Sequence, residues 1–245
     1  MKYSLSVIAV LMALCMWSCS SGDSKEKMST RADDKQSSSE MRMYPPLEKY
    51  IGEITGDFDS ISAERKNLLT EVSDYIRSKR KEGEAARLTF ICTHNSRRSH
   101  MSQIWAATAA RHYGIDNIIT TFSGGTEATA FNPRAVAAMQ RAGFTINNPG
   151  GENPPYEVTF SENGPEMICF SKKYDDMANP SSGFMAVMTC SDADENCPII
   201  PGAEKRVPVT YEDPKAFDGT DREAIAYDER CRQIATEMFY VMSQV

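Results

Sequence analysis

The stretch that decides the fold is Leu88-Thr89-Phe90-Ile91-Cys92-Thr93-His94-Asn95-Ser96-Arg97-Arg98-Ser99. Its apolar beginning, residues 88–91, is typical of a short buried strand. A helix is predicted from about Ser99 to Tyr113, because apolar residues recur at helical spacing and several alanines favour helix. Residues 92–98 therefore form a loop between a strand and a helix. In such a loop, successive N–H groups and the positive end of the helix dipole can surround an anion.

The sequence on both sides of this stretch alternates between strand and helix patterns. Further strands are predicted at 118–122, 167–170 and 184–188, and helices at 62–81, 133–142 and 225–242. This alternation predicts an α/β fold with a four-stranded parallel sheet, helices on both of its faces and an N-terminal helical extension. We expect the functional site at the carboxyl ends of the strands.

The first residues are typical of a targeting segment. Lys2 precedes an apolar run, 5–17, that is too short for a mature membrane-spanning helix. The run ends at Ser18-Cys19-Ser20, which resembles the lipobox of bacterial lipoproteins, in which the Cys becomes the lipidated N-terminus. We therefore expect a lipoprotein-type signal peptide at 1–18, a lipid anchor on Cys19, and a location in the bacterial cell envelope, in the periplasm or on the outer surface. An ordinary secretory signal that is cleaved nearby is the alternative.

Composition divides the rest of the chain into three parts. Residues 19–46 are rich in Ser, Lys, Asp and Glu and carry few apolar residues, so they are expected to form a flexible tether. Residues 47–86 are expected to form the helical extension. Residues 87–245 contain the anion loop and the predicted sheet, and we expect them to form the functional domain.

The overall composition excludes several classes of protein. The chain has 245 residues, 41% of them hydrophobic, and a formal net charge of −7. The apolar share is enough for a folded core and excludes a wholly disordered chain. The acidic balance argues against nucleic acid as a partner, because nucleic-acid surfaces select for Lys and Arg. The expected contact with the membrane is the lipid anchor, and we expect a monomer.

Cys92 is the candidate nucleophile. The loop N–H groups, the helix dipole and Arg98 would favour its thiolate, which can attack phosphorus or arsenic. Arg98 can hold two oxygens of a tetrahedral ion as a bidentate fork. The other interpretation is a buried Cys at a strand end beside two surface arginines. The candidate oxyanion-binding residues are Thr93, His94, Asn95, Ser96, Arg97, Arg98 and Ser99.

The motif Cys92-x5-Arg98-Ser99, with Asn95 inside it, is similar to the anion loop of the low-molecular-weight protein tyrosine phosphatases, whose fold is shared by thioredoxin-coupled arsenate reductases. Segments 123–127 and 132–135 resemble those that follow the second strand in this family. Asp213-Pro214 resembles the late Asp-Pro that supplies the family's general acid. The resemblance implies that Cys92 attacks the bound ion and that Asp213 protonates the departing oxygen.

Cys190 and Cys197 distinguish the two branches of this superfamily. A Cys-x6-Cys at this place is typical of the reductases, which must dispose of two electrons. The resemblance then implies a relay. Cys190 attacks Cys92 and releases arsenite, and Cys197 moves the disulfide to Cys190–Cys197, where an external dithiol such as a thioredoxin-like protein reduces it. Two alternatives stay open. One is a structural Cys190–Cys197 disulfide on a phosphatase that hydrolyses phosphomonoesters, and the other is a non-catalytic oxyanion- or redox-sensing lipoprotein.

The remaining polar residues predict no bound cofactor. Gln103 stands where some of the reductases carry a Glu that helps to hold a cation, so no metal is expected. His94 replaces a Gly of the family, so the loop must tolerate a side chain in a tight turn. His100 is expected at the surface or at a helix cap. Cys169 and Cys231 are expected to be small residues of the core.

Overall fold

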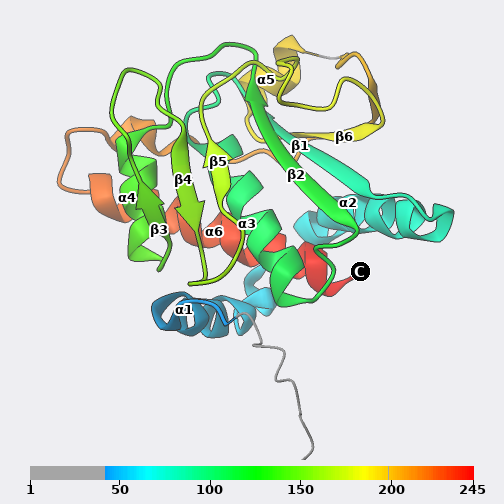
Figure 1. Cartoon of the computed structure of the whole chain (residues 1–245), viewed down its shortest axis with the longest axis horizontal. Coiled ribbons are helices and arrows are strands. Elements are labelled where there is room, and N and C mark those ends of the chain that lie inside the picture. The colour runs from blue at the N-terminus through cyan, green and yellow to red at the C-terminus, as the bar shows by residue number, and fades with distance from the viewer. Residues whose placement is uncertain (1–41, 198) are drawn as a thin grey trace, which may run out of the picture. The chain divides into compact units, whose positions relative to one another are not determined.

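A parallel four-stranded sheet lies at the centre of the computed structural model, which describes residues 42–197 and 199–245 (Figure 1). Its strands are β1 (Ala86–Cys92), β2 (Ile119–Gly125), β6 (Phe184–Met188) and β7 (Ala203–Val207), in the order β2-β1-β6-β7. All neighbouring pairs are parallel, so the predicted α/β fold is confirmed. The predicted signal peptide, Cys19 and most of the predicted tether lie outside the described residues.

Alternate residues of the central strands face two separate apolar cores. On β1, Leu88 and Phe90 pack into the larger core, whereas Ile91 packs into the smaller one. β6 repeats the pattern, because Val187 faces the larger core and Met188 the smaller one. A strand that is buried on both faces has a continuous apolar run, which is why β1 and β6 could be predicted.

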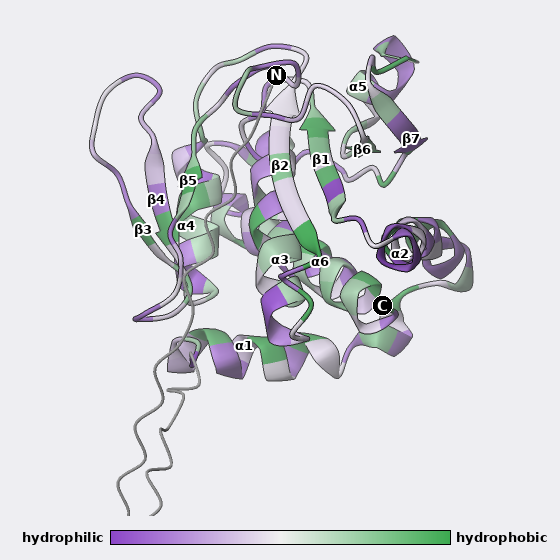
Figure 2. Ribbon diagram, turned by 45° about the vertical axis from the view of Figure 1, so that its right-hand side comes forward, coloured by the Kyte–Doolittle hydropathy of each residue, from purple (hydrophilic) through white to green (hydrophobic). Residues whose placement is uncertain are grey.

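Helices cover the two faces of the sheet unequally. The larger core lies under α1 (Pro45–Thr55), α2 (Ala63–Glu82), α3 (Arg98–His112), α4 (Pro133–Arg141) and α6 (Glu223–Ser243). Along α1, green and purple segments alternate in Figure 2, as expected of a helix with one buried side. The smaller core is covered by α5 (Ser191–Asn196), which contributes Ala193, together with loop residues. Within the described part of the chain, no helix has the length and apolar character needed to cross a membrane.

A second, antiparallel sheet corrects one prediction. It consists of β3 (Thr145–Asn147), β4 (Tyr156–Thr159) and β5 (Met167–Cys169), in the order β3-β4-β5. The predicted strand 167–170 thus belongs to this small sheet and not to the parallel one, and Ile168 is 49% exposed. The fourth parallel strand is β7, whose sequence Ala-Glu-Lys-Arg-Val is not the apolar run of a central strand. An edge strand can carry such residues, because one of its sides faces solvent.

The predicted helices are confirmed, and their ends follow ordinary capping rules. α4 begins at Pro133 after Asn132, whose side chain accepts hydrogen bonds from two backbone N–H groups of the first turn. α2 begins after Ser62, whose hydroxyl caps it in the same way, and ends at Gly83 with φ +75°. The short 3-10 helices η1 (Phe58–Ser60) and η2 (Pro214–Phe217) lie in the connections that precede α2 and α6.

The N-terminal helices pack onto the rest of the fold mainly through α6. α1 and α2 both contact α6, and α2 also contacts β1 and β7. Ser73 Oγ of α2 donates a hydrogen bond of 3.0 Å to the carbonyl of Val241. Arg65 of α2 forms a two-pronged ion pair with Glu237 of α6, with N–O distances of 3.1 and 2.8 Å. These contacts fix α2 beside the C-terminal helix.

Candidate functional site

The loop 93–97 joins β1 to α3 at the carboxyl end of the parallel sheet (Figure 1). The carbonyl oxygens of Thr93, His94 and Ser96 accept hydrogen bonds of 2.8, 2.9 and 2.8 Å from groups outside the loop. In a trans peptide the N–H points away from the carbonyl, and every described peptide bond is trans. The N–H groups of residues 94, 95 and 97 therefore point away from these outer contacts, as an anion-binding loop requires.

The left-handed turn of the loop falls on Asn95 and not on His94. Asn95 has φ +43° and is the one non-glycine residue with positive φ in the described part of the chain. Asn adopts this conformation more readily than most residues, so the loop can form without a glycine at position 94. Gly125, at the end of β2, lies against the turn. A Cβ there would come within 2.6 Å of the Asn95 nitrogen and 2.7 Å of the Thr93 oxygen. The loop thus depends on a glycine in the neighbouring strand.

Ser99 presents its hydroxyl proton to the sulfur of Cys92. Its Oγ lies 3.1 Å from Cys92 Sγ, and Asn95 Nδ2 donates to the same Oγ over 2.8 Å. Because Asn95 is the donor in its bond, the proton of Ser99 is available to the sulfur. Asn95 is in turn oriented by the backbone N–H of Lys172, which donates to its Oδ1 over 3.0 Å. Cys92, Asn95 and Ser99 are all buried, so this chain of hydrogen bonds fixes the position of the Cys92 sulfur at the start of the loop.

Arg98 connects the loop to the segment that carries Asp213. Its Nη1 donates to the carbonyl of Tyr211 over 2.8 Å, and its Nη2 donates to Asp213 Oδ2 over 2.7 Å. Asp213 Oδ1 also accepts the N–H of Lys215 at the start of η2, which holds the carboxylate in place. The Nε of Arg98 is buried and has no hydrogen-bond acceptor in the described part of the chain. A buried donor without an acceptor is costly, and an oxyanion in the loop would supply the acceptor.

Arg97 lies beside the same carboxylate, although its guanidinium is held by other groups. Its Nε donates to Tyr227 Oη over 2.9 Å, and its Nη2 lies 3.8 Å from Asp218 Oδ2. Tyr227 Oη donates to Asp218 Oδ1, and burial raises the pKa of this phenol to about 12. Arg97 Nε is 3.9 Å from Asp213 Oδ1. Arg97 therefore adds positive charge next to Asp213, and it lines the loop with its backbone.

Cys190 and Cys197 stand at the two ends of α5. Cys190 is the N-cap residue, and its Sγ accepts a hydrogen bond of 3.4 Å from the backbone N–H of Ala193. Cys197 is the C-cap residue. Both are free thiols, and Cys190 is only 1% exposed. Cys92 and Cys190 belong to the smaller apolar core, and Cys197, which is partly buried, packs against it. The structure thus brings the three predicted redox cysteines together.

Thr93 links the loop directly to α5. Its Oγ1 donates a hydrogen bond of 2.6 Å to Asp192 Oδ2 and lies 3.5 Å from Cys190 Sγ. At the other end of α5, Arg206 of β7 donates to the carbonyl of Cys197 over 3.2 Å and to the carbonyl of Asp194. The short helix is therefore held at its first turn by the anion loop and at its last turn by the edge strand.

Comparison with known proteins identifies the family of this chain. Residues 87–151, which include the loop and α4, match the family model described as low molecular weight phosphotyrosine protein phosphatase. An arsenate reductase of Bacillus licheniformis is 31% identical over 143 residues, which cover 58% of this chain and 84% of that protein. The chain belongs to the low-molecular-weight phosphotyrosine phosphatase family.

Other relatives agree with this assignment. Arsenate reductase 2 of Staphylococcus epidermidis is 30% identical over 125 residues, which cover 51% of this chain and 76% of that protein. A crystal structure of a low-molecular-weight phosphotyrosine phosphatase from Vibrio cholerae O395 aligns with 65% of this chain and 95% of that chain, at 15% identity and a TM-score of 0.45.

Several residues of this phosphatase-family site were not predicted. Tyr227 and Asp218 hold Arg97, Lys172 orients Asn95, and Arg206 holds α5. None of them lies in a recognisable motif. Each acts on a partner that is distant in sequence, so a single sequence carries no signal for the contact. For Asp218 alone the sequence offers a local signal, because Asp218-Gly219 is a typical turn dipeptide shortly after Asp213-Pro214.

The prediction for His100 is wrong, whereas those for the two isolated cysteines are confirmed. His100 is fully buried, its Nδ1 lies 3.2 Å from Ser123 Oγ, and burial lowers its pKa to about 3. A serine on the neighbouring strand thus gives this ring a polar contact inside the core. Cys169 and Cys231 are buried, and burial raises the pKa of each thiol to about 12, which makes both unreactive.

Gln103 contacts the neighbouring strand β2. Its Nε2 donates to the carbonyl of Thr121 over 3.2 Å. In residues 42–197 and 199–245, no group of three or more His, Cys, Asp or Glu side chains is arranged to hold a metal ion.

Proposed function

We propose that this protein reduces arsenate to arsenite through Cys92, Cys190 and Cys197. The observation that carries the proposal is that Cys92 and Cys190 share one small apolar core beside the anion loop and that Cys197 packs against it, all three as free thiols. A phosphatase of this family needs one nucleophilic Cys, whereas removal of an oxygen from arsenic requires two electrons and hence two thiols. The names of the relatives in Bacillus and Staphylococcus point in the same direction.

The first step is attack by the Cys92 thiolate on arsenic. The inward N–H groups of the loop and the guanidinium of Arg98 hold the oxyanion, with Nε of Arg98 gaining its acceptor. A sulfur–arsenic bond forms and one arsenic–oxygen bond breaks. The departing hydroxyl leaves as water after it takes a proton from the carboxyl of Asp213. In the free site this group is a carboxylate that accepts from Arg98 Nη2, so it first gains that proton from solvent.

The second step transfers the electrons. The thiolate of Cys190 attacks Cys92 Sγ, and the sulfur–arsenic bond breaks with its electron pair on arsenic. Arsenic(V) becomes arsenic(III), which leaves as arsenite, and two thiols become the Cys92–Cys190 disulfide. Thr93, whose hydroxyl lies 3.5 Å from Cys190 Sγ, brings the two reacting segments together.

The third step moves the disulfide without further net oxidation. Cys197 attacks Cys190 and frees Cys92, and an external dithiol then reduces the Cys190–Cys197 bond and is itself oxidised. Seven residue steps along α5 separate these cysteines by roughly 10 Å along the helix axis. The Cα atoms of a disulfide lie only about 4.4–6.8 Å apart. α5 must therefore unwind in this step, and its two attachments, at Thr93 and Arg206, would have to give way.

Thiol mapping after a single turnover tests the proposal. Reduced protein is mixed with arsenate, alkylated and digested, and arsenite is counted. We expect a Cys190–Cys197 disulfide in the native chain, a trapped Cys92–Cys190 disulfide in Cys197→Ser, and no arsenite from Cys190→Ser. Cys169→Ser is the matched control, since this thiol lies in the other core, and it should release arsenite normally. Normal arsenite release from both Cys190→Ser and Cys197→Ser would exclude the relay.

Hydrolysis of phosphomonoesters is the second candidate. It is favoured by the match of residues 87–151 to the phosphatase family model and needs only Cys92, Arg98 and Asp213. Turnover of an aryl phosphate that survives in Cys190→Ser and Cys197→Ser, with no arsenite formed by the native chain, would select it. Loss of both activities in Cys92→Ser is expected under either candidate, and retention of both would exclude them together.

The cellular location determines the reductant. Cys19 as a lipid anchor would place the domain outside the cytoplasm, so we propose a thioredoxin-like dithiol protein of the cell envelope as electron donor. A mass spectrum of the mature N-terminus tests the anchor. A diacylglyceryl-modified Cys19 is expected, and an unmodified N-terminus at another residue would exclude it.

A further inference from the structure

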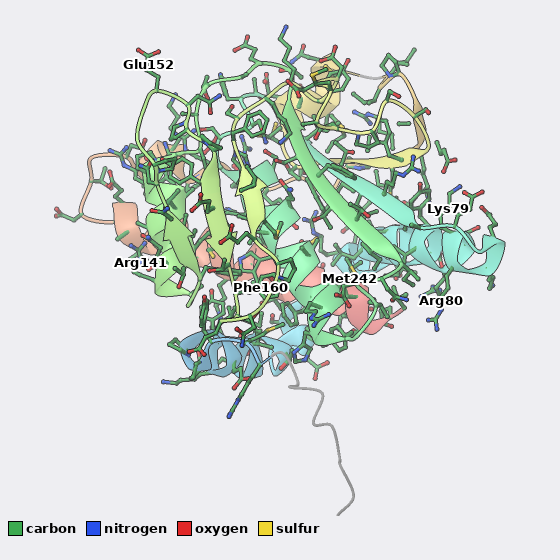
Figure 3. The ribbon with its side chains drawn as sticks, viewed as in Figure 1. Lys79, Arg80, Arg141, Glu152, Phe160 and Met242 are labelled. Carbon is green, nitrogen blue, oxygen red and sulfur yellow. The ribbon has the colours of Figure 1, made fainter. Side chains whose placement is uncertain are left out.

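A cavity of about 490 Å³ lies between β2 and β5, and none of its lining residues belongs to the loop 93–97. β2 is the edge strand of the parallel sheet and β5 is an edge strand of the small sheet. Phe160, which Figure 3 labels, is one of the apolar side chains that line it. The others include Phe122, Pro165, Met167, Ile168 and Phe170. The volume lies within the range of small-molecule sites, about 300–1,000 Å³.

Lys172 places a buried positive charge in the wall of this cavity. The residue is 6% exposed, and the described residues place no carboxylate oxygen within 4.0 Å of its Nζ, although the charge of Asp176 acts on it from a longer distance. Its Nζ lies 4.6 Å from the ring centroid of Phe170 and 3.5 Å from the carbonyl oxygen of that residue. Burial lowers the pKa of the amine. An ammonium group has three donors, so most of its hydrogen-bonding capacity is left for an anion.

Two amide oxygens in the same cavity have no hydrogen-bond partner among the described residues. Gln103 Nε2 donates to Thr121 O over 3.2 Å and Asn179 Nδ2 donates to Ser123 O over 3.0 Å, whereas Gln103 Oε1 and Asn179 Oδ1 are buried and accept no bond from residues 42–197 or 199–245. Because Thr121 and Ser123 are two residues apart on β2, the two amides lie about 7 Å apart along its edge. They already occupy two carbonyls of that edge. An extended peptide could not pair with it unless both side chains moved away, so the cavity suits a small molecule.

We propose that this cavity binds a small carboxylate that has an apolar body and a hydrogen-bond donor beside the carboxylate, the pattern of an apolar α-amino acid. The carboxylate pairs with Lys172 Nζ, and the neighbouring donor meets Gln103 Oε1 or Asn179 Oδ1. The apolar side chain packs on the aromatic and aliphatic wall. The site is independent of the chemistry at Cys92, although the backbone N–H of Lys172 holds Asn95 in the anion loop.

Calorimetric titration of the full chain with three probes tests the proposal. L-phenylalanine carries both polar groups, 3-phenylpropionate lacks the ammonium, and phenethylamine lacks the carboxylate. We expect saturable binding of L-phenylalanine, binding of 3-phenylpropionate that is weaker by about tenfold, and no binding of phenethylamine. Added inorganic phosphate should leave these affinities unchanged, which separates this site from the anion loop.

Two variants and one matched control complete the test. Lys172→Met should weaken L-phenylalanine by tenfold or more, whereas Lys173→Met, an exposed neighbour, should not. Of Gln103→Leu and Asn179→Leu, one should lower the affinity for L-phenylalanine to that for 3-phenylpropionate and leave the latter unchanged, which keeps the test valid if Lys172→Met fails to fold. Full L-phenylalanine affinity in both variants would also overturn the proposal. The proposal is overturned by undiminished binding to Lys172→Met, by equal binding of phenethylamine, by the absence of saturable binding, or by binding of an end-blocked peptide in place of the amino acid.

Discussion

Replacement of Arg65 by Met measures how firmly the N-terminal helices are joined to the catalytic fold. The Arg65 and Glu237 side chains are 20% and 4% exposed, and they form the two-pronged ion pair between α2 and α6. Arg65 Nη2 also donates to the carbonyl of Thr210 over 3.1 Å, and the guanidinium lies 5.0 Å from the ring centroid of Tyr211. Met fills much of the same space, but it leaves the carboxylate of Glu237 buried without its cation.

The cost follows from that uncompensated charge. Removal of one partner of a buried ion pair costs about 3–5 kcal/mol of the free energy of unfolding. At this chain length, each kcal/mol lowers the melting temperature by about 2–4 °C, so Arg65→Met should melt roughly 6–20 °C lower. The double variant Arg65→Met/Glu237→Met should recover most of the loss, because no charge stays buried. Urea unfolding at pH 7, followed by far-UV circular dichroism, gives the three free energies.

An exposed ion pair between α4 and α6 is the control. Arg141, labelled in Figure 3, pairs with Asp228 at 2.6 Å, and both side chains are 45% exposed. Solvent screens such a pair, so Arg141→Met should cost less than about 1 kcal/mol. Equal losses from Arg65→Met and Arg141→Met would refute the reasoning, as would a double variant no more stable than Arg65→Met.

Three further predictions concern the core, the loop and α5. Burial lowers the pKa of His100 to about 3, below an unfolded value of about 6.5, so between these pH values the unfolded chain binds one proton more than the folded chain. The free energy of unfolding therefore decreases as the pH is lowered, by about 2 kcal/mol at pH 5. His100→Asn should flatten this part of the pH profile in urea unfolding, and an unchanged slope would contradict this explanation. Gly125→Ala should abolish binding of arsenate and phosphate in calorimetry, since its Cβ would meet the backbone of the loop, whereas Gly52→Ala, with no atom within 4 Å, should bind normally. Arg206→Met should speed formation of the Cys190–Cys197 disulfide in quenched-flow alkylation by freeing the last turn of α5, and a rate equal to that of Lys205→Met would show that this turn does not limit the step.

The sequence pattern predicted strands that are buried on both faces and helices whose first residues are typical capping residues. β1 and β6 are continuous apolar runs, and α4 has Asn132 and Pro133 at its start. β7 escaped prediction because an edge strand of a parallel sheet can expose Glu204 and Lys205. The run at 167–170 was assigned to the wrong sheet, since periodicity in so short a segment does not distinguish a central strand from one with an exposed side chain such as Ile168.

The part of the site that lies in one continuous stretch of sequence could be predicted. Cys92, Arg98 and Ser99 lie within eight positions, and the spacing carries the chemistry. The partners that orient them could not be predicted, because Lys172 lies 77 positions from Asn95 and Tyr227 lies 130 positions from Arg97. The burial of His100 depends in the same way on Ser123, which only the packing of α3 against β2 brings near.

The sulfur of Cys190 both caps α5 and, under the proposed relay, forms disulfides, and the second role removes the first. As a thiol it caps the N-terminus of α5 by accepting the N–H of Ala193. Loss of an N-cap costs about 1 kcal/mol, which is a large share of the stability of a helix of only six residues. A disulfide at Cys190 withdraws that acceptor. The redox state of the cysteines would thereby change the backbone conformation of α5, and a reductase could recognise the oxidised protein by the different surface at this helix.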